Sequence, residues 1–518
     1  MLSQSSCIYL CLLLSGFFGI LVTGEFYSSI DKMEILGEME ETLVEATHIY
    51  LVQQQQQFQL LSSFVDRIRR EHASASEMHE QNEEYLEQPL QAFRLIKRLV
   101  IDWKDLNHLL AMNELKANYR NLLDEMDKEV EVLPNLEELQ GAIKGLVRLQ
   151  DVYNLTASDL ADGNLNGKKT DSALNWRDCF EIGVQLYEMA EYKRALQWFV
   201  LADKLLDEVH GDNTLKMATE VYEYLALTYI ELGEMNTAQE TLTKLLTWNS
   251  AHPTQHIQAH LDHRMPKCPI KKEDSEYFSD YVRLCQGKRL PEIKTNQSSP
   301  RCYLDSNQHA YFKLSPLKVE QVNLAPDINI YYDVLNDNQI KSILELSTEF
   351  ESFRSSVNKY NVTDKRVSQQ VWLNYSSPIM RTYRQLVGAI SGFNMTNAEI
   401  MQVANYGIGG QYEPHHDFSG ANLAARYANF GDRISTNMIY LSDVQQGGYT
   451  VFPTQNVFVK PIKGAMVMWH NLLRSLDGDR RTLHAGCPVI EGTKRIGNIW
   501  IHSGYQEFRR PCTLNSKE

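Results

Sequence analysis

The sequence predicts a multidomain α + β protein, with an all-helical amino-terminal half and a carboxyl-terminal double-stranded β-helix, or jelly-roll, domain. From residue 25 to residue 262, apolar side chains recur three and four positions apart, which is typical of packed helices. Residues 319–518 instead contain short apolar runs separated by turn residues, which is the rhythm of a jelly roll. At 518 residues the chain is long enough for several domains.

Residues 1–24 are typical of a secretory signal peptide. The apolar run Ile8–Val22 is too short to span a bilayer comfortably, and Val22–Gly24 supplies small residues for cleavage. No Lys or Arg precedes the run, so an uncleaved anchor is the alternative. We expect no other membrane span. The net charge of −15 argues against nucleic acid or an anionic membrane surface as a partner, because both require basic patches.

Sequons and cysteines support a secretory compartment. Two of the eight cysteines lie in the leader, and the others form no Cys-x-x-Cys motif, so disulfides are a better interpretation than a zinc site. The candidate glycosylation sites are Asn154, Asn296, Asn361, Asn374 and Asn394.

Residues 25–165 are predicted to form a helical domain with a heptad seam. A seam of this kind suits the pairing of helices, and its polar members Gln53 and Gln57 can specify the register. A long amphipathic helix packed within its own domain is the alternative. The seam contains Leu36, Met39, Leu43, Ala46, Tyr50, Gln53, Gln57, Leu60 and Phe64.

Residues 166–262 show the spacing of tetratricopeptide-like repeats. Small and large side chains alternate in two helical hairpins, and the concave surface of such repeats binds extended peptides. Tyr192 and Tyr229 stand at consensus positions and are expected in the core. The candidate peptide-binding residues are Tyr187, Tyr222 and Tyr224. Residues 263–318 follow as a predicted linker without periodicity, and residues 319–518 form the barrel domain.

The stretch Tyr412–Asp417 is predicted to hold a metal. Because alternate residues of a strand face the same side, His415 and Asp417 would project together, whereas His416 would point away and is not expected to bind. His484, from a distant strand, would complete a set of two imidazoles and one carboxylate. This set suits ferrous iron and leaves positions open for a bidentate cosubstrate and dioxygen. A zinc hydrolase is disfavoured, since no H-E-x-x-H motif is present.

Residues 400–518 resemble the catalytic domain of the collagen prolyl 4-hydroxylase α subunit. The matching stretches are Asn405–His415 (Asn-Tyr-Gly-x-Gly-Gly-Gln-Tyr-Glu-Pro-His), Gly447–Pro453 (Gly-Gly-x-Thr-Val-Phe-Pro) and Gln506–Leu514. Pro89–Leu99 is a further match. The resemblance implies a dioxygenase that uses Fe(II), 2-oxoglutarate, O2 and ascorbate. Its activity would be the hydroxylation of proline at C4 in collagen-like or other proline-rich secretory proteins, with 2-oxoglutarate converted to succinate.

The resemblance also suggests residue roles around the metal. Lys494 would pair with the 5-carboxylate of 2-oxoglutarate, and His502 would assist cosubstrate binding or decarboxylation. Tyr406 and Tyr440 could hydrogen-bond the cosubstrate, although packing in the barrel is an equal alternative. Trp469 and Trp500 are expected to be core aromatics.

Disulfides and partners are implied in the same way. The family spacing pairs Cys285 with Cys302 and Cys487 with Cys512, makes Cys179 a free helical cysteine and leaves the partner of Cys268 open. The amino-terminal helices would dimerise two α chains, and a protein disulfide isomerase would complete an α2β2 tetramer in the endoplasmic reticulum lumen. We expect such a partner because Asn515–Glu518 is no retrieval signal.

Two other functions remain open at this point. The first is a non-catalytic peptide-binding paralogue that has kept the metal fold, and the second is a hydroxylase of another residue, such as lysine. Leu227 and Ile230 stand where the family continues a ladder of tyrosines after Tyr224, so the sequence does not specify which proline-rich protein would be bound.

Overall fold

The computed structural model describes residues 30–81, 136–170, 173–206, 214–248, 278–291, 300–350, 353–354, 365–407, 409–419, 430–511 and 515. The chain divides into two compact units, of which the first is built around residues 31–134 and the second contains residues 135–518. Residues 136–165, the last part of the helical domain predicted for residues 25–165, are grouped with the second unit. No helix among the described residues is long and apolar enough to cross a membrane.

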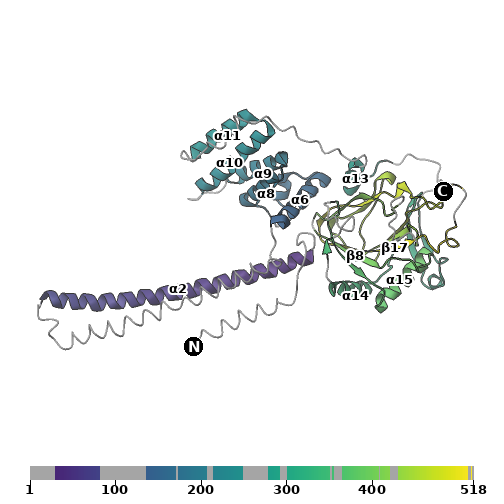
Figure 1. Ribbon diagram of the computed structural model, residues 1–518, viewed down its shortest axis with the longest axis horizontal. Coiled ribbons are helices and arrows are strands. Elements are labelled where there is room, and N and C mark those ends of the chain that lie inside the picture. Colours follow the sequence, from purple (N-terminus) through teal and green to yellow (C-terminus); the bar gives the residue numbers. More distant parts are fainter. Residues whose placement is uncertain are drawn as a thin grey trace. The chain divides into compact units, whose positions relative to one another are not determined.

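In the first unit, α2 (Ile30–Gln81) is one uninterrupted helix of 52 residues (Figure 1). The predicted seam lies on its less exposed face, where Ala46 and Phe64 are buried, although Leu60 is 48% exposed. A second apolar row with a seven-residue period is exposed to solvent. The row consists of Val44, Leu51, Phe58 and Val65, which are 64%, 59%, 72% and 42% exposed.

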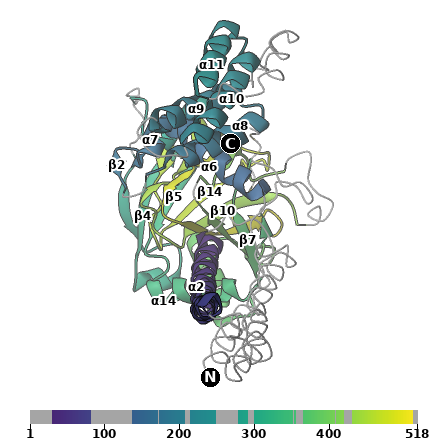
Figure 2. The ribbon, with the colours of Figure 1, turned by 90° about the vertical axis from the view of Figure 1, so that its left-hand side faces the viewer.

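Four helices form two hairpins in the repeat region, stacked one after another (Figure 2). An Asn175 cap with reciprocal bonds to Asp178 begins the first helix. Close packing explains one glycine, because a β-carbon on Gly183 would lie 2.6 Å from the ring of Phe199. Cys179 is buried and free, as expected. The helices are α8 (Trp176–Glu188), α9 (Tyr192–Leu206), α10 (Thr214–Leu232) and α11 (Met235–Trp248).

The larger sheet of the barrel is antiparallel and has nine strands. Its central strands come from widely separated parts of the sequence, since β17, near the end of the chain, pairs with both β10 and β8. In spatial order the strands are β3 (Cys302–Asp305), β4 (Leu317–Leu324), β5 (Asp327–Tyr332), β14 (Met466–His470), β10 (Arg433–Tyr440), β17 (Lys494–His502), β8 (Met401–Tyr406), β7 (Gln369–Leu373) and β6 (Phe353–Arg354).

A second, four-stranded sheet faces the first. Two short ribbons complete the strands of the second unit: β11 (Gln446–Gly447) with β16 (Val489–Glu491), and β1 (Asn164–Leu165) with β2 (Lys168–Lys169). The order of the four strands is β13 (Val457–Val459), β12 (Thr450–Phe452), β15 (His484–Gly486) and β9 (Tyr412–His415).

Three apolar layers hold the barrel together. The interior cluster includes Tyr406, Tyr440, Phe452, Trp469 and Ile496. The outer face of the larger sheet is covered by α14 (Asp337–Thr348) and α15 (Pro378–Ser391), which Figure 1 shows along one side of the barrel. The outer face of the smaller sheet is covered by α6 (Leu136–Tyr153) and α13 (Phe278–Cys285). A short helix, α7 (Ala157–Ala161), follows α6.

Both predicted disulfides are corrected by the structure, which joins Cys285 to Cys487 with a Cα–Cα distance of 5.5 Å. Cys285 is the last residue of α13 and is buried against the four-stranded sheet beside Cys487. Cys302 is a free, exposed cysteine at the beginning of β3. Cys268 and Cys512 lie outside the described residues.

The predicted linker is also corrected. Residues 278–285 form α13, and β3 and the 3-10 helix Ala310–Lys313 belong to the barrel domain, which therefore begins before residue 319. No periodic signal appears in the sequence here because α13 has only eight residues and β3 only four. Their apolar residues are selected by tertiary contacts rather than by a local repeat.

Candidate iron and 2-oxoglutarate site

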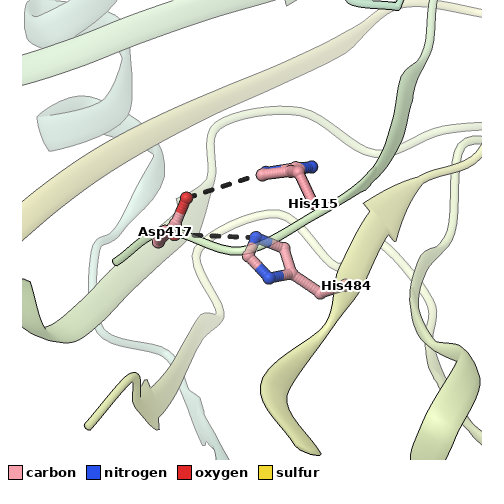
Figure 3. A group of neighbouring side chains, drawn as sticks. All are labelled: His415, Asp417 and His484. Carbon is pink, nitrogen blue, oxygen red and sulfur yellow. Dashed lines mark ion pairs between the residues drawn. The ribbon is translucent and has the colours of Figure 1, made fainter. Parts of the chain in front are cut away.

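The three predicted ligands lie on adjacent strands of the smaller sheet. His415 ends β9, and His484 begins β15; the two residues are direct partners in the antiparallel pairing. Their rings are consequently neighbours, with centroids 4.3 Å apart. Asp417 follows two residues after His415 and turns toward both rings, as Figure 3 shows.

The geometry of these side chains fits a metal ion. His415 Nε2 is 3.6 Å from Asp417 Oδ1, and His484 Nε2 is 3.5 Å from Asp417 Oδ2. All candidate ligand atoms lie within 4.8 Å of one another. His415 Nδ1 bonds the Glu413 carbonyl at 2.7 Å, and His484 Nδ1 bonds the Thr482 carbonyl at 3.0 Å. Because each Nδ1 is occupied as a donor, each Nε2 is left as the acceptor that a metal needs.

Buried donors hold the carboxylate of Asp417. Oδ2 accepts hydrogen bonds from Thr436 Oγ1 at 2.6 Å and from Trp500 Nε1 at 2.9 Å. Asn471 in turn donates to Thr436 Oγ1 at 2.9 Å. Trp500 was expected to be a core aromatic, but its indole also positions a metal ligand. Strand alternation in the sequence partly indicates this role, because Trp500 lies on the same face of its strand as Lys494 and His502.

Electrostatics keep the site in the protonation state that binds a metal. Burial raises the pKa of Asp417, but the neighbouring His484, His415 and Arg433 and the Thr436 hydrogen bond outweigh burial and hold that pKa far below its usual range. Burial and the proximity of His484 lower the pKa of His415 well below its ordinary value. The carboxylate is therefore ionised while the imidazole of His415 is neutral near physiological pH.

An aromatic and cationic stack supports His415 from the side, and no pattern in the sequence indicates it. The ring of Tyr412 lies flat on His415 with centroids 3.4 Å apart, and the guanidinium of Arg366 covers the other side of Tyr412 at 4.7 Å. Arg366 is buried and donates to Gln402 Oε1 at 2.7 Å. Trp469, a core residue as expected, packs edge-on against His484.

Lys494 is a buried cation at the first residue of β17. Lys494 is 2% exposed, and no carboxylate of the described residues lies within ion-pair distance of its ammonium group. Burial alone lowers its pKa to about 7. The ammonium lies 5.6 Å from the ring centroid of Tyr406 and borders Gly486, where a β-carbon would stand 3.6 Å from Nζ. A buried ammonium of this kind is stabilised when an anion enters beside it.

The two tyrosines near Lys494 face the same interior. Tyr406 is the direct pairing partner of Lys494 across β8 and β17, and Tyr440 lies on β10. Both are buried in the interior cluster, and the Tyr440 hydroxyl donates to Thr450 Oγ1 at 2.8 Å. They therefore pack in the core and also line the same interior face as Lys494.

His502 stands at the opposite end of β17 from Lys494, about 26 Å along an extended strand. Its Nδ1 lies 2.7 Å from the Gly431 carbonyl, and its Nε2 lies 3.0 Å from Glu399 Oε1. Glu399 also binds Arg433 in bidentate fashion at 2.6 and 3.0 Å, and Arg433 covers the ring of Trp500 at 4.0 Å. This ion-paired group reaches Asp417 through Trp500, so His502 lies on the metal side of the interior.

His416 lies outside the ligand set. Its Nε2 is 3.1 Å from the Arg480 carbonyl, and its ring packs against Phe418 with centroids 4.8 Å apart. This placement agrees with the alternation argument, since the side chain leaves the strand on the other face from His415.

The repeat tyrosines separate into two kinds. Tyr222 is only 7% exposed and belongs to the repeat core, so its prediction as a peptide contact is corrected. Tyr187 and Tyr224 are half-buried, with ring centroids 5.7 Å apart in an edge-on arrangement. Tyr192 and Tyr229, expected in the core, are also half-buried. We call Tyr187, Tyr192 and Tyr224, with Phe180, the aromatic patch; its rings contact one another in pairs.

The candidate sequons differ in exposure. Asn154 and Asn374 are exposed, whereas Asn394 is half-buried and its side chain accepts from the backbone and hydroxyl of Thr396. Asn296 and Asn361 lie outside the described residues.

Comparison with known proteins defines the class of the barrel domain. Residues 401–502 match the 2OG-Fe(II) oxygenase superfamily, residues 29–167 match the prolyl 4-hydroxylase alpha-subunit N-terminal region, and residues 176–261 match the prolyl 4-hydroxylase peptide-substrate-binding domain. With the His415, Asp417 and His484 triad, this makes the protein an Fe(II)- and 2-oxoglutarate-dependent dioxygenase.

Relatives along the whole chain define the family more closely. The chain is 32% identical over 517 residues to prolyl 4-hydroxylase subunit alpha-2 of Gallus gallus, covering 94% of this chain and 95% of that protein. It is also 32% identical over 524 residues to subunit alpha-1 of Homo sapiens, covering 95% and 96%. The chain belongs to the prolyl 4-hydroxylase alpha-subunit family.

Among solved structures, the viral collagen prolyl hydroxylase of Paramecium Bursaria Chlorella virus-1 in complex with 2OG is 24% identical. It covers 34% of this chain and 95% of its own, with a TM-score of 0.29.

Proposed function

We propose that the protein hydroxylates proline at C4 in collagen-like or other proline-rich proteins of the secretory pathway. The reaction would convert 2-oxoglutarate to succinate and CO2, with ascorbate supporting turnover. The observation that carries this proposal is the buried Lys494, a cation that faces the same barrel interior as the triad and has no anionic partner among the described residues. A dicarboxylate bound to the metal at one end would supply the missing anion at the other.

Each residue of the interior would have a separate task. His415, Asp417 and His484 would hold Fe(II), which when bound supplies the activation of O2 that couples decarboxylation to hydroxylation. Trp500 and Thr436 would orient Asp417. Lys494 would orient 2-oxoglutarate through its 5-carboxylate, and Tyr406 and Tyr440 would shape the space around the carbon chain. The apolar interior would exclude water from the reacting atoms.

The aromatic patch on the repeats would bind the peptide. Tyrosine rings stack on proline rings with little loss of entropy, because a proline-rich peptide is already extended. Tyr187 and Tyr224 are half-buried, so each exposes part of its ring. Burial raises the pKa of the Tyr224 hydroxyl, and nearby carboxylates raise this pKa further. The negative charge of these carboxylates would favour a peptide without acidic residues. These carboxylates are Glu188, Glu223, Glu181 and Glu220.

The compartment and the partners belong to the same proposal. Burial of the Cys285–Cys487 disulfide supports folding in an oxidising lumen, which would be the endoplasmic reticulum. An α–α contact would use the exposed row Val44, Leu51, Phe58 and Val65 of α2, because this row keeps the seven-residue period of a coiled coil. A protein disulfide isomerase would complete the α2β2 assembly.

The test is turnover by the full chain co-expressed with a protein disulfide isomerase. With Fe(II), ascorbate and a proline-rich peptide, succinate and 4-hydroxyproline should form in equal amounts. His415→Ala should reduce both by more than about a hundredfold, since even outer-sphere partners of metal ligands are worth tenfold to hundredfold. The matched control is His416→Ala, which removes a neighbouring imidazole outside the triad and should retain turnover. Equal losses in the two variants would contradict the proposed iron site.

A further inference from the structure

From outside the barrel, helix α6 contacts the two turns that adjoin the strands of His415 and His484. Arg148 Nε donates to the carbonyl of Gly409 at 2.9 Å, in the turn that leads into β9 and His415. The Tyr153 hydroxyl donates to the carbonyl of Pro488 at 2.6 Å, in the turn that follows His484 and β15. One helix therefore holds the entrance to one ligand strand and the exit from the other.

The two turns are also bonded to each other. The Gly409 amide donates to the Val489 carbonyl at 2.8 Å, and the Val489 amide donates to the Gly410 carbonyl at 3.2 Å. The backbone of α6 lies directly against the first of these turns. A β-carbon on Gly409, at φ +67°, would stand only 2.7 Å from Gly145 of α6. A displacement of α6 at this contact would move the turns, since no side chain lies between the two glycines to absorb it.

The same helix is anchored to the repeats by its other side. Ile143 is part of the repeat core, together with Leu146 and Val147, whereas Leu149 and Tyr153 are part of the layer on the ligand sheet. Polar contacts add to this anchoring. Arg194 of α9 binds both carboxylate oxygens of Asp151 at 2.8 Å, and Gln140 donates to Gln185 of α8 at 3.2 Å.

We propose that Arg148 and Tyr153 are positioning residues for the iron-binding strands, and that α6 makes the iron site depend on the repeats. The inference rests on the proposed function only in taking the metal to be iron. Of the two hydrogen bonds, the one from Arg148 should contribute more to holding the strands, because a charged donor to a carbonyl contributes more than a neutral one. The peptide-binding repeats would thus influence catalysis through the ligand strands as well as by holding substrate.

The first experiment uses Arg148→Gln in the full chain, and its first two measurements need no turnover. In the metal-free protein, exchange protection of the Gly409 and Val489 amides should fall about tenfold, which is the loss expected for one charge-assisted hydrogen bond. Fe(II) affinity, measured by anaerobic titration, should fall by a similar factor, and kcat should fall while the KM for peptide stays constant. Arg148→Lys should recover most of the affinity, because it keeps the charge and one donor.

Two further variants separate positioning from general destabilisation. Tyr153→Phe keeps the ring in the core and removes only the hydroxyl, so it should give a smaller loss of about threefold for a neutral hydrogen bond. Arg194→Gln, on the repeat side, should also weaken Fe(II) binding although it lies outside the barrel. The matched control is Glu137→Gln, which changes one exposed charge on α6 and should leave Fe(II) affinity unchanged.

Two results would overturn the proposal. One is wild-type exchange and Fe(II) affinity in both Arg148→Gln and Tyr153→Phe. The other is a loss of affinity that follows the melting temperature in every variant without rescue by Arg148→Lys, since a purely structural role predicts that pattern. A chain that binds Fe(II) normally but forms no hydroxyproline would instead contradict the proposed function and leave these measurements valid.

Discussion

The iron site and the repeats hold their functional side chains in different ways. In the iron site, each ligand has its remaining polar atoms engaged: the imidazole Nδ1 atoms by carbonyls, and the Asp417 carboxylate by Thr436 and Trp500. In the repeats, Tyr187 and Tyr224 are half-buried and meet neighbouring rings edge-on. Metal chemistry requires ligands fixed in one geometry, whereas aromatic stacking tolerates small displacements. Replacing a single functional side chain should therefore reduce binding strongly in the barrel and only mildly in the repeats.

Among losses outside the triad, the largest effect is expected at Trp500, one of the two donors that hold Asp417. Trp500→Phe removes the indole N–H that bonds Asp417 and should lower Fe(II) affinity by roughly tenfold to hundredfold. Anaerobic metal titration measures it. Trp372→Phe removes the neighbouring indole, 6.2 Å away by ring centroids, and is the matched control. If both variants bind Fe(II) like the wild type, Asp417 does not need the hydrogen bond from Trp500.

The next effect concerns the cosubstrate. Lys494→Met keeps the length of the side chain and removes its charge, so the KM for 2-oxoglutarate should rise about tenfold or more, for a hydrogen bond worth roughly 1.5–3 kcal/mol. The KM for peptide should change little. Arg495→Gln, at the adjacent position of β17, is the control and the rival partner for the 5-carboxylate. A larger rise in Arg495→Gln would transfer the role to that residue.

The lowered pKa of Lys494 predicts how cosubstrate binding depends on pH. At a pKa of about 7 the free protein loses the ammonium proton as pH rises through 7, and binding a carboxylate must restore it. The KM for 2-oxoglutarate should therefore rise by roughly tenfold per pH unit above that pKa. The same shift affects stability. Between about pH 7 and 10.5 the unfolded chain keeps this proton whereas the folded chain has lost it, so the free energy of unfolding increases with pH over this range. A KM for 2-oxoglutarate that is constant from pH 6 to 8.5 would contradict the lowered pKa of Lys494.

The smallest effect is expected in the aromatic patch. Tyr224→Ala removes one ring among several, so the KM for a long proline-rich peptide should rise only about threefold to tenfold, at roughly 0.5–1.5 kcal/mol per aromatic contact. The KM for a tripeptide too short to reach the repeats should not change. Tyr222→Phe, in the repeat core, is the control. A hundredfold effect in Tyr224→Ala would mean that the repeats are as rigidly specified as the iron site.

Disulfide pairing shows where spacing in the sequence misleads. The separations of Cys285 from Cys302 and of Cys487 from Cys512 are short, yet the bond joins Cys285 to Cys487 across 202 residues. Connectivity depends on which Cα atoms come within about 4.4–6.8 Å, and that distance is set by the packing of α13 on the ligand sheet. Local spacing carries no information about this packing.

The heptad of α2 shows a related limit. The predicted seam through Leu43, Tyr50 and Phe64 is the less exposed face, while Val44, Leu51 and Phe58 form an exposed row one position away. Two apolar stripes on one helix have almost the same period, so periodicity alone does not say which stripe stays open to a second chain. Burial in the folded unit distinguishes them.

What the sequence determined by itself was the chemistry. The alternation of strand side chains assigned His415 and Asp417 to one face and excluded His416, and the types of ligand indicated iron. The tertiary structure decided which groups meet. It paired His484 with His415 and directed the Trp500 indole toward Asp417. It also buried Lys494 with no carboxylate of the described residues within ion-pair distance, and it placed α6 against the turns beside both ligand strands. The reason is that ligand identity is a property of single side chains and their neighbours in the chain. Hydrogen-bond register and apolar burial, in contrast, act between residues that are tens to hundreds of positions apart.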